Sequence, residues 1–148
     1  MAHLPSFRPQ SIVFLTAVTF ERRPLLSQPS SHKILRVIWE RSAERNGWYV
    51  GDYVLMPDHV HFFAQATTGS DRMCDWVRMW KSVSSRQITK VLNVRVPVWQ
   101  EDYFDRYLRS AESYGQKWQY VRNNPVRAGL VRCPEDSPYQ GRIWSLNT

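Results

Sequence analysis

Two histidines have the type and spacing of residues that could do chemistry. His59 and His61 flank Val60 in HVHFFAQA, a segment rich in β-forming residues. Because side chains alternate along a strand, both imidazoles are expected on one face, with their nitrogens about 6–7 Å apart. Such a pair can converge on one metal ion. Two structural histidines with satisfied hydrogen bonds would fit the same spacing.

Tyr120 lies in the second candidate segment, a predicted helix that is capped by Ser110 and ends before Pro125. At about 100° per residue, the apolar residues of this helix share one face: Ala111, Tyr114, Trp118 and Val121. Tyr120 points nearly opposite to that face, and Asn124 follows one turn later on the side of Tyr120. An exposed aromatic residue and an ordinary helix C-cap before proline are the structural alternatives.

These candidates together would make a site for phosphodiester cleavage. A tyrosine hydroxyl is a weak nucleophile unless its electrophile is activated, and a metal ion that polarises a phosphoryl oxygen provides that activation. Two imidazoles and one amide oxygen leave coordination positions open for a substrate. We therefore take Tyr120 as the candidate nucleophile and His59, His61 and Asn124 as candidate metal ligands.

The charge of the chain favours a partner that carries phosphates. Its 148 residues include 20 Lys and Arg against 13 Asp and Glu, so the formal charge is +7. With 14% aromatic residues, this excess suits single-stranded nucleic acid, and composition alone leaves acidic proteins and anionic membranes as alternative partners. Arg78, Lys81 and Arg86 share the polar face of a helix predicted over residues 71–92, and Arg127 follows the tyrosine. Each is a candidate DNA-backbone contact, or else part of a solvated basic face.

The elements that would position these residues follow a βαββαβ order. Strands are predicted over residues 12–20, 48–56, 59–66 and 98–108, and helices over residues 30–45, 71–92 and 110–124. Ser30 or Ser31 is the expected N-cap of the first helix, and Asn46-Gly47 its end. This order predicts an α+β, ferredoxin-like fold with an antiparallel sheet and an additional C-terminal helix that carries the tyrosine.

A single domain is expected for the whole chain, residues 1–148, with a core of about residues 8–133 and a loop-like tail from 134. Cys74 and Cys133 match neither a disulfide framework nor a zinc site, which favours a cytoplasmic location. Thr16 and Thr19 interrupt the apolar segment that follows MAHLPSFRPQ, so we expect a strand rather than a signal peptide. No run approaches the roughly 18 apolar residues of a membrane span.

Several segments resemble a known family. MPDHVHFFA resembles the His-hydrophobe-His motif of the HUH single-strand transposases and relaxases. QYVRNNPVRAGLV resembles the tyrosine helix of the REP-associated tyrosine transposases, a single-tyrosine branch of that superfamily. FLTAVTFERRPLL and VWQEDYFDRYLR resemble flanking segments, so the similarity covers about residues 8–133.

This resemblance implies a nuclease that acts on single-stranded DNA, often at hairpins of repetitive palindromic elements, as a monomer or homodimer. Tyr120 would form a 5′-phosphotyrosine link and free a 3′-hydroxyl. His59 and His61 would bind a divalent metal, Mg²⁺ or Mn²⁺. Asn124 matches the position of the polar third ligand, which is glutamine in related insertion-sequence transposases.

Two other interpretations stay open. A ferredoxin-like module without chemistry would bind single-stranded RNA or DNA by stacking, although HVHFFAQA lacks the basic-Gly-aromatic pattern of RNA-recognition sheets. A domesticated transposase would keep the site and bind repeat hairpins as a regulator. The family's last strand more often ends in Asp-His, where this chain has Asp105 and Arg106, so the resemblance assigns no role to Arg106.

Overall fold

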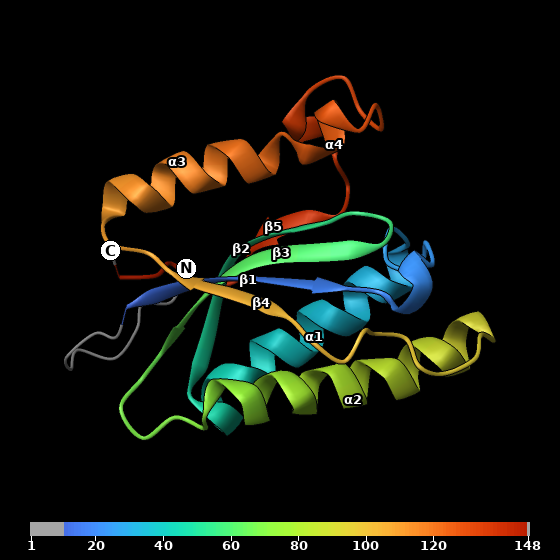
Figure 1. Ribbon diagram of the computed structural model, residues 1–148, viewed down its shortest axis with the longest axis horizontal. Coiled ribbons are helices and arrows are strands. Elements are labelled where there is room, and N and C mark those ends of the chain that lie inside the picture. The colour runs from blue at the N-terminus through green and yellow to red at the C-terminus, as the bar shows by residue number, and fades with distance from the viewer. Residues whose placement is uncertain (1–10, 148) are drawn as a thin grey trace.

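A five-stranded antiparallel sheet forms the centre of the computed structural model, which describes residues 11–147 (Figure 1). Its strand order is β4-β1-β3-β2-β5. The strands are β1 (Ile12–Val18), β2 (Trp48–Leu55), β3 (His59–Ala66), β4 (Phe104–Tyr107) and β5 (Gln140–Arg142). The predicted α+β class and ferredoxin-like antiparallel sheet are confirmed. The segment MAHLPSFRPQ, which includes the first residues of the expected core, lies outside the described residues.

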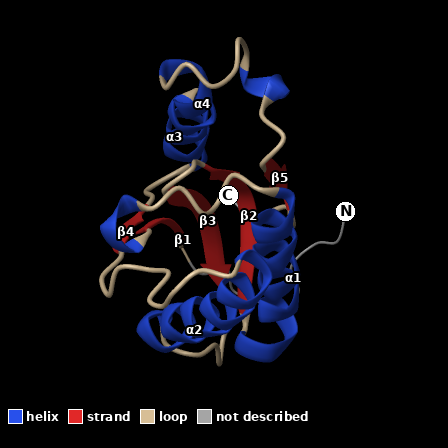
Figure 2. Ribbon diagram, turned by 90° about the vertical axis from the view of Figure 1, so that its right-hand side faces the viewer, coloured by secondary structure: helices blue, strands red, loops and turns tan. Residues whose placement is uncertain are grey.

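The longer helices form layers on both faces of this sheet (Figures 1 and 2). They are α1 (Pro29–Asn46) and α2 (Met73–Leu92) on one face and α3 (Ala111–Arg122) on the other. Three short helices complete the set. η1 (Phe20–Arg22) follows β1, α4 (Asn124–Arg127) follows α3, and η2 (Pro134–Asp136) comes after α4. Within residues 11–147, no helix combines the length and the apolar character needed to cross a membrane.

The main hydrophobic core lies between the sheet and the α1/α2 layer. Trp39 is fully buried, and its ring centroid lies 4.7 Å from that of Phe62 and 5.7 Å from that of Trp80. Leu35 of α1, like Trp39, is fully buried, so both residues lie on the face of the helix that packs on the sheet. Apolar residues three and four positions apart produce this face.

The start of the first helix differs from the prediction. Gln28 is the N-cap of α1, and neither Ser30 nor Ser31 caps the helix. Ser31 is buried instead, and its hydroxyl donates a 2.6 Å hydrogen bond to the carbonyl of Leu25. The predicted end is confirmed, since Gly47 adopts a left-handed conformation with φ of 73° directly after the helix.

The strand predicted over residues 98–108 is mostly a loop. Its four-residue segment β4 forms a ladder with β1, and the Gln100 amide donates a separate 2.9 Å hydrogen bond to the Val18 carbonyl. Trp99 forms an isolated bridge with Thr19. The residues that follow are held by the Lys81 ammonium, which donates to three carbonyls: Gln100 at 2.8 Å, Glu101 at 3.3 Å and Asp102 at 2.8 Å. These carbonyl groups are therefore directed toward α2 rather than into a sheet ladder.

Lys81 consequently lacks the exposed position that the helical pattern predicts. Its residue is 8% exposed, whereas Arg78 and Arg86 on the same helix are exposed, so the expectation of one shared basic face is wrong. Burial lowers the pKa of Lys81 to about 8, although the neighbouring carboxylates of Asp102 and Glu101 act in the opposite direction. Lys81 anchors the loop that leads into β4, and its charge is not presented to solvent.

The tail is also more ordered than predicted, because residues 140–142 add strand β5 to the edge of the sheet next to β2. The Arg142 guanidinium donates to both carboxylate oxygens of the buried Asp52, at 2.9 and 3.0 Å. Further along, the Asn147 carbonyl accepts a 2.8 Å hydrogen bond from the Gln65 side chain. The tail from residue 134 is therefore loop-like only in part, because η2 and β5 lie within it.

Candidate active site

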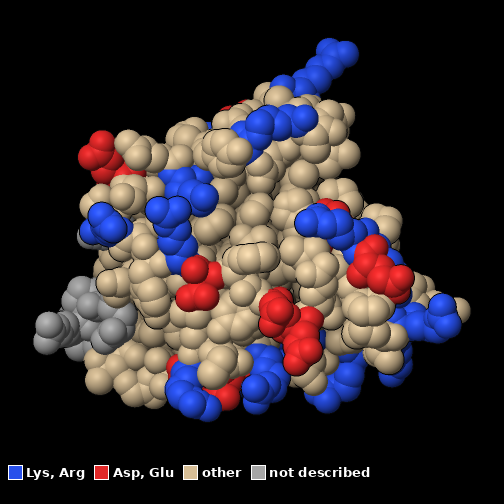
Figure 3. All heavy atoms as spheres, in the orientation of Figure 1, with Lys and Arg blue, Asp and Glu red and all other residues tan. Residues whose placement is uncertain are grey.

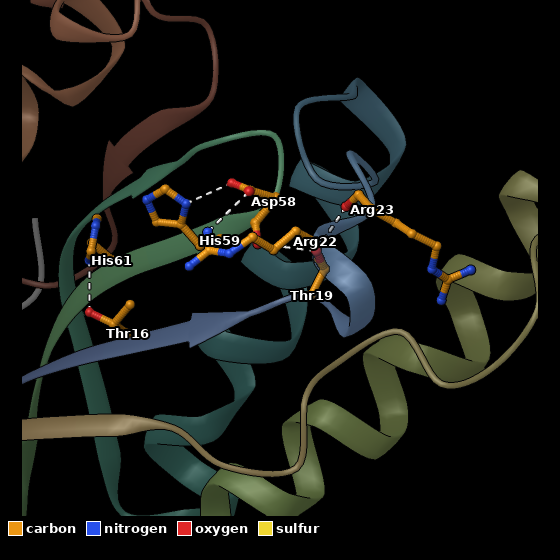
Figure 4. A network of polar contacts seen from close by, with 7 residues as sticks. All are labelled: Thr16, Thr19, Arg22, Arg23, Asp58, His59 and His61. Carbon is orange, nitrogen blue, oxygen red and sulfur yellow. Dashed lines mark hydrogen bonds and ion pairs between the residues drawn. The ribbon is translucent and has the colours of Figure 1, made fainter.

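The two candidate histidines project from the same side of β3 (Figure 4), where His61 stacks on Phe14 of the apolar cluster that also includes Trp118 of α3. They alternate along the strand with Val60 and Phe62, which are fully buried in the core on the α1/α2 side. The ring centroids of His59 and His61 are 4.7 Å apart, with the rings nearly perpendicular at 78°. The sequence prediction that both imidazoles share one face agrees with this geometry.

One nitrogen of each imidazole is oriented by a neighbouring side chain (Figure 4). The Nδ1 atom of His59 lies 2.8 Å from the Asp58 carboxylate, and the Nδ1 atom of His61 lies 2.8 Å from the Thr16 hydroxyl. Among the described residues, neither Nε2 atom has a hydrogen-bond partner. Outer partners of this kind fix the orientation of histidines that bind metals, so the pair fits a divalent cation.

The surroundings of His61 keep its imidazole neutral. Burial lowers its pKa to about 3, and the positive charges of His59, Lys117 and Arg127 act in the same direction. Its ring also stacks on the Phe14 ring, with centroids 5.3 Å apart. The neutral imidazole is the form that binds metal ions.

The tyrosine helix packs across this face of the sheet. The hydroxyl of Ser110 accepts a 3.2 Å hydrogen bond from the Ser113 amide and caps α3, as predicted. Tyr114, Trp118 and Val121 pack in a small apolar cluster with sheet residues that include Phe63. The predicted stripe is confirmed for these three residues. The side chain of Ala111 lies outside the described part of the structure.

Tyr120 lies opposite to that stripe and is 62% exposed, as its helical position predicts. The Arg127 guanidinium lies over its ring, 4.0 Å from the centroid, and donates a 2.7 Å hydrogen bond to the Tyr120 carbonyl. Arg127 also donates to the side-chain oxygen of Asn124. Arg127 therefore joins α3 to α4. Its guanidinium contacts both Tyr120 and Asn124, the two residues that the sequence predicts on one side of the helix.

Lys117 was missed by the sequence analysis, yet it links the two halves of the site. Its Nζ atom lies 4.7 Å from the centroid of the Phe14 ring and 5.9 Å from that of Tyr120. Because Phe14 stacks on His61, this ammonium lies between the tyrosine and the histidine face. Its position one turn before Tyr120 was the available sequence signal.

Tyr114, unlike Tyr120, is a structural tyrosine. Its hydroxyl donates a 2.5 Å hydrogen bond to the carboxylate of Asp52, which also holds Arg142 of β5. Burial, followed by this hydrogen bond, raises the pKa of Tyr114 well above its usual range. The resulting network attaches α3 to β2 and to the C-terminal segment.

The structure gathers some of the candidate residues and separates others. No described contact joins Asn124 to either histidine, and within residues 11–147 no group of three or more His, Cys, Asp or Glu is placed to hold a metal ion. Arg78 and Arg86 belong to α2, on the opposite side of the sheet from α3. Figure 3 shows basic side chains along the α2 edge, at the bottom of the view, and separately around the α3 layer.

Comparison with known proteins identifies the class of protein. The family model "Transposase IS200 like" matches residues 10–124, so the chain belongs to the IS200-like transposase family. This result agrees with the resemblance inferred from the histidine and tyrosine motifs.

Two relatives carry a more specific description. The chain is 27% identical over 108 residues to the REP-associated tyrosine transposase of Escherichia coli (strain K12), a match that covers 73% of this chain and 59% of the relative. It is 23% identical over 94 residues to a Haemophilus influenzae (Rd) protein described in the same way, a match that covers 57% of this chain and 53% of that relative. The chain therefore matches less than two thirds of the length of these relatives.

Solved structures support the fold. A REP-associated tyrosine transposase bound to a REP hairpin superimposes with a TM-score of 0.70 at 20% identity, covering 95% of this chain and 82% of that chain. A Deinococcus radiodurans protein described as a transposase superimposes with a TM-score of 0.59 at 23% identity, covering 83% of this chain and 97% of that chain. The layered arrangement of Figure 1 is thus the fold of known transposases.

Proposed function

We propose that this protein is a single-stranded DNA endonuclease and strand transferase that cleaves at hairpin-flanked sites through a 5′-phosphotyrosine intermediate. The observation that carries the proposal is the position of Tyr120, exposed beside Lys117 and Arg127 on the layer that covers the histidine face. Membership of the IS200-like family supports DNA strand transfer. The similar structure bound to a REP hairpin supports a hairpin substrate.

The proposed step is a transesterification at phosphorus. The Tyr120 oxygen attacks the scissile phosphate, the new O–P bond forms and the bond to the 3′-oxygen breaks. The phenol proton passes to solvent, and the leaving oxygen takes a proton to become a 3′-hydroxyl. The cationic groups of Arg127 and Lys117 lie where they can offset the charge that develops on the phosphate. The reverse reaction with another 3′-hydroxyl would complete strand transfer.

His59 and His61 would hold a divalent cation, Mg²⁺ or Mn²⁺, through their Nε2 atoms. Such an ion would polarise a phosphoryl oxygen. Asn124 is the proposed third ligand. Its side-chain oxygen accepts a hydrogen bond from Arg127, so binding a cation requires its second lone pair or the withdrawal of Arg127.

Of the basic candidates, Arg127 is proposed to contact DNA close to the cleaved bond. Arg78 and Arg86 could contact only a part of the DNA that passes around the edge of the sheet to the α2 layer. Lys81 is no longer a candidate because its ammonium is bound to carbonyls. We expect the protein to act in the cytoplasm as a monomer or homodimer, in keeping with its two free thiols.

The nucleophile is tested with labelled single-stranded DNA hairpins and Mg²⁺ or Mn²⁺, analysed on denaturing gels. The wild type should form an SDS-resistant protein–DNA adduct, and Tyr120→Phe should form none. Tyr49→Phe, which removes a half-buried hydroxyl on β2, is the matched control and should retain the adduct. An adduct of undiminished yield in Tyr120→Phe would show that the assignment is wrong. Hairpin binding by the wild type without any adduct would favour a non-catalytic regulator.

The cation site is tested by calorimetric titration with Mn²⁺. His59→Ala and His61→Ala should each abolish binding and cleavage while hairpin affinity changes little. Thr16→Val, which removes the partner of His61 Nδ1, should lower Mn²⁺ affinity about 10- to 100-fold. Unchanged Mn²⁺ affinity in the histidine variants would remove the pair from the mechanism.

A further inference from the structure

The η1 segment, which follows β1, carries an arginine that reaches one of the two histidines through a carboxylate (Figure 4). The Arg22 guanidinium lies 3.2 Å from Oδ2 of Asp58, and Oδ1 of the same carboxylate lies 2.8 Å from Nδ1 of His59. Each oxygen of Asp58 therefore has a different partner, and the carboxylate is held from both sides. Arg22 belongs to FLTAVTFERRPLL, one of the flanking segments of the family resemblance.

The carboxylate determines which nitrogen of His59 is free. An ionised carboxylate accepts hydrogen bonds and has no proton to donate, so Nδ1 of His59 carries the proton and donates it. The Nε2 atom then has a free lone pair, which is the form of an imidazole that binds a cation. The Thr16 hydroxyl beside His61 can donate or accept, and so imposes no tautomer on that ring. Asp58 is therefore the partner that fixes a tautomer in this pair.

The backbone of η1 is strained at the point where Arg22 makes its contact. Glu21 and Arg22 both have positive φ values, 56° and 50°. Residues other than glycine rarely adopt this left-handed region, and they keep it only where the surrounding contacts impose it. Two such residues in succession indicate that the direction of the Arg22 side chain is enforced by its surroundings.

The contacts that enforce this direction come from both sides of η1. Thr19 is fully buried, and its amide and hydroxyl lie 2.9 and 3.1 Å from the Asp58 carbonyl. The Thr19 hydroxyl also lies 2.8 Å from the Arg23 carbonyl. The Arg23 guanidinium in turn donates to the carbonyls of Arg95 and Pro97. η1 is thus attached both to the turn before β3 and to the loop after α2, which gives Arg22 a fixed support.

We propose that Arg22 is a positioning residue, which holds the Asp58 carboxylate so that His59 presents its Nε2 atom to a divalent cation. This inference rests on the proposed function, because the cation site is part of it. Arg22 itself does not touch the cation. Its charge alone would act in the opposite direction, since a guanidinium repels a divalent cation. The two effects therefore predict changes of opposite sign when Arg22 is replaced.

Calorimetric titration with Mn²⁺ measures that sign. Arg22→Gln should weaken Mn²⁺ binding about three- to fivefold, the range of one exposed ion pair, because the released carboxylate holds His59 less firmly. Arg22→Lys keeps a cation beside Asp58 and should retain most of the affinity. Asp58→Ala should weaken binding about 10- to 100-fold. Adding Arg22→Gln to Asp58→Ala should cause no further loss, because Arg22 acts through this carboxylate.

Two variants separate positioning from general charge and from folding. Arg41→Gln is the matched control, because it removes an exposed arginine of α1, in the opposite layer, and it should leave Mn²⁺ affinity unchanged. Arg22→Gly removes the guanidinium but adopts a positive φ without strain. Its free energy of unfolding should be about that of the wild type, whereas its Mn²⁺ affinity should fall as in Arg22→Gln.

A spectroscopic measurement tests the arrangement without any metal. Long-range proton–nitrogen NMR spectra of the metal-free wild type should show the proton of His59 on Nδ1. In Arg22→Gln a larger share of His59 should carry it on Nε2, and Arg41→Gln should match the wild type. Unchanged or tighter Mn²⁺ binding in Arg22→Gln, an additive loss in the double variant, or an unchanged tautomer would overturn the assignment.

Failure of this inference is distinguishable from failure of the proposed function. If the wild type binds Mn²⁺ through the histidines and Arg22→Gln binds it equally well, Arg22 is not a positioning residue and the cation site stands. If the wild type binds no Mn²⁺, the cation site is wrong and the inference falls with it. A His59 tautomer that still depends on Arg22 would then show that the network only stabilises the fold.

Discussion

The two faces of the sheet differ in what holds their helices. On the α1/α2 face, large rings such as those of Trp39, Trp80 and Phe62 are almost completely buried against one another. On the α3 face the apolar cluster is small, and a hydrogen bond from Tyr114 to Asp52 contributes to docking. Stability therefore comes mainly from one face, and the other face presents the oriented imidazoles of His59 and His61 beside the cationic groups of Lys117 and Arg127.

The largest effect on stability is expected from Trp39→Ala. Removing this fully buried ring leaves a cavity among the rings of Tyr53, Phe62 and Trp80, so the free energy of unfolding should fall by about 3–5 kcal/mol. Urea denaturation followed by circular dichroism measures this loss. A decrease below about 1 kcal/mol would contradict the assignment of the main core to this face.

A smaller loss of stability but a specific loss of activity is expected from Tyr114→Phe. The ring can still pack against Phe63, while Asp52 loses a hydrogen bond, which should cost about 1–3 kcal/mol. Because Tyr120 belongs to the same helix, the yield of the DNA adduct should fall even at temperatures well below the melting point. Tyr49→Phe serves again as the control, and unchanged adduct yield in Tyr114→Phe would show that this attachment does not position the nucleophile.

The smallest effect is a pH dependence on the α1/α2 side. The pKa of Lys81 is about 8 in the folded protein, below its ordinary value of 10.5. Above pH 8 the folded chain therefore releases a proton that the unfolded chain keeps, and the free energy of unfolding should rise by about 1 kcal/mol from pH 8 to pH 9. Lys81→Met should lack this component, as measured by urea denaturation at several pH values. Parallel pH profiles for the two proteins would contradict it.

Local periodicity predicted the parts of the site that depend on one element. Alternation along β3 placed His59 and His61 on one face, and helical rotation placed Tyr120 opposite the apolar stripe of α3. The βαββαβ order predicted the sheet for similar reasons, because each element has a clear pattern of apolar residues.

Residues whose surroundings come from distant segments were beyond this reasoning. Lys81 occupies a polar position on its helix, but its ammonium is buried because it donates hydrogen bonds to the carbonyls of residues 100–102. The contacts of Lys117 depend on the register that brings Phe14 beneath α3. Strand β5 has three residues and no alternating pattern. It pairs with β2, and an ion pair joins Asp52 to Arg142, which lies ninety positions further along the chain.

The attachment of α3 through Asp52 has a consequence for the order of events during synthesis. The Asp52 carboxylate accepts a hydrogen bond from the Tyr114 hydroxyl and also binds Arg142, a residue that is translated after the whole of α3. A nascent chain that ends before Gln140 contains every residue of the proposed site and still lacks the strand that shares this carboxylate. The proposed cleavage activity would then require residues 140–142 to have left the ribosome and paired with β2, although none of them belongs to the proposed site.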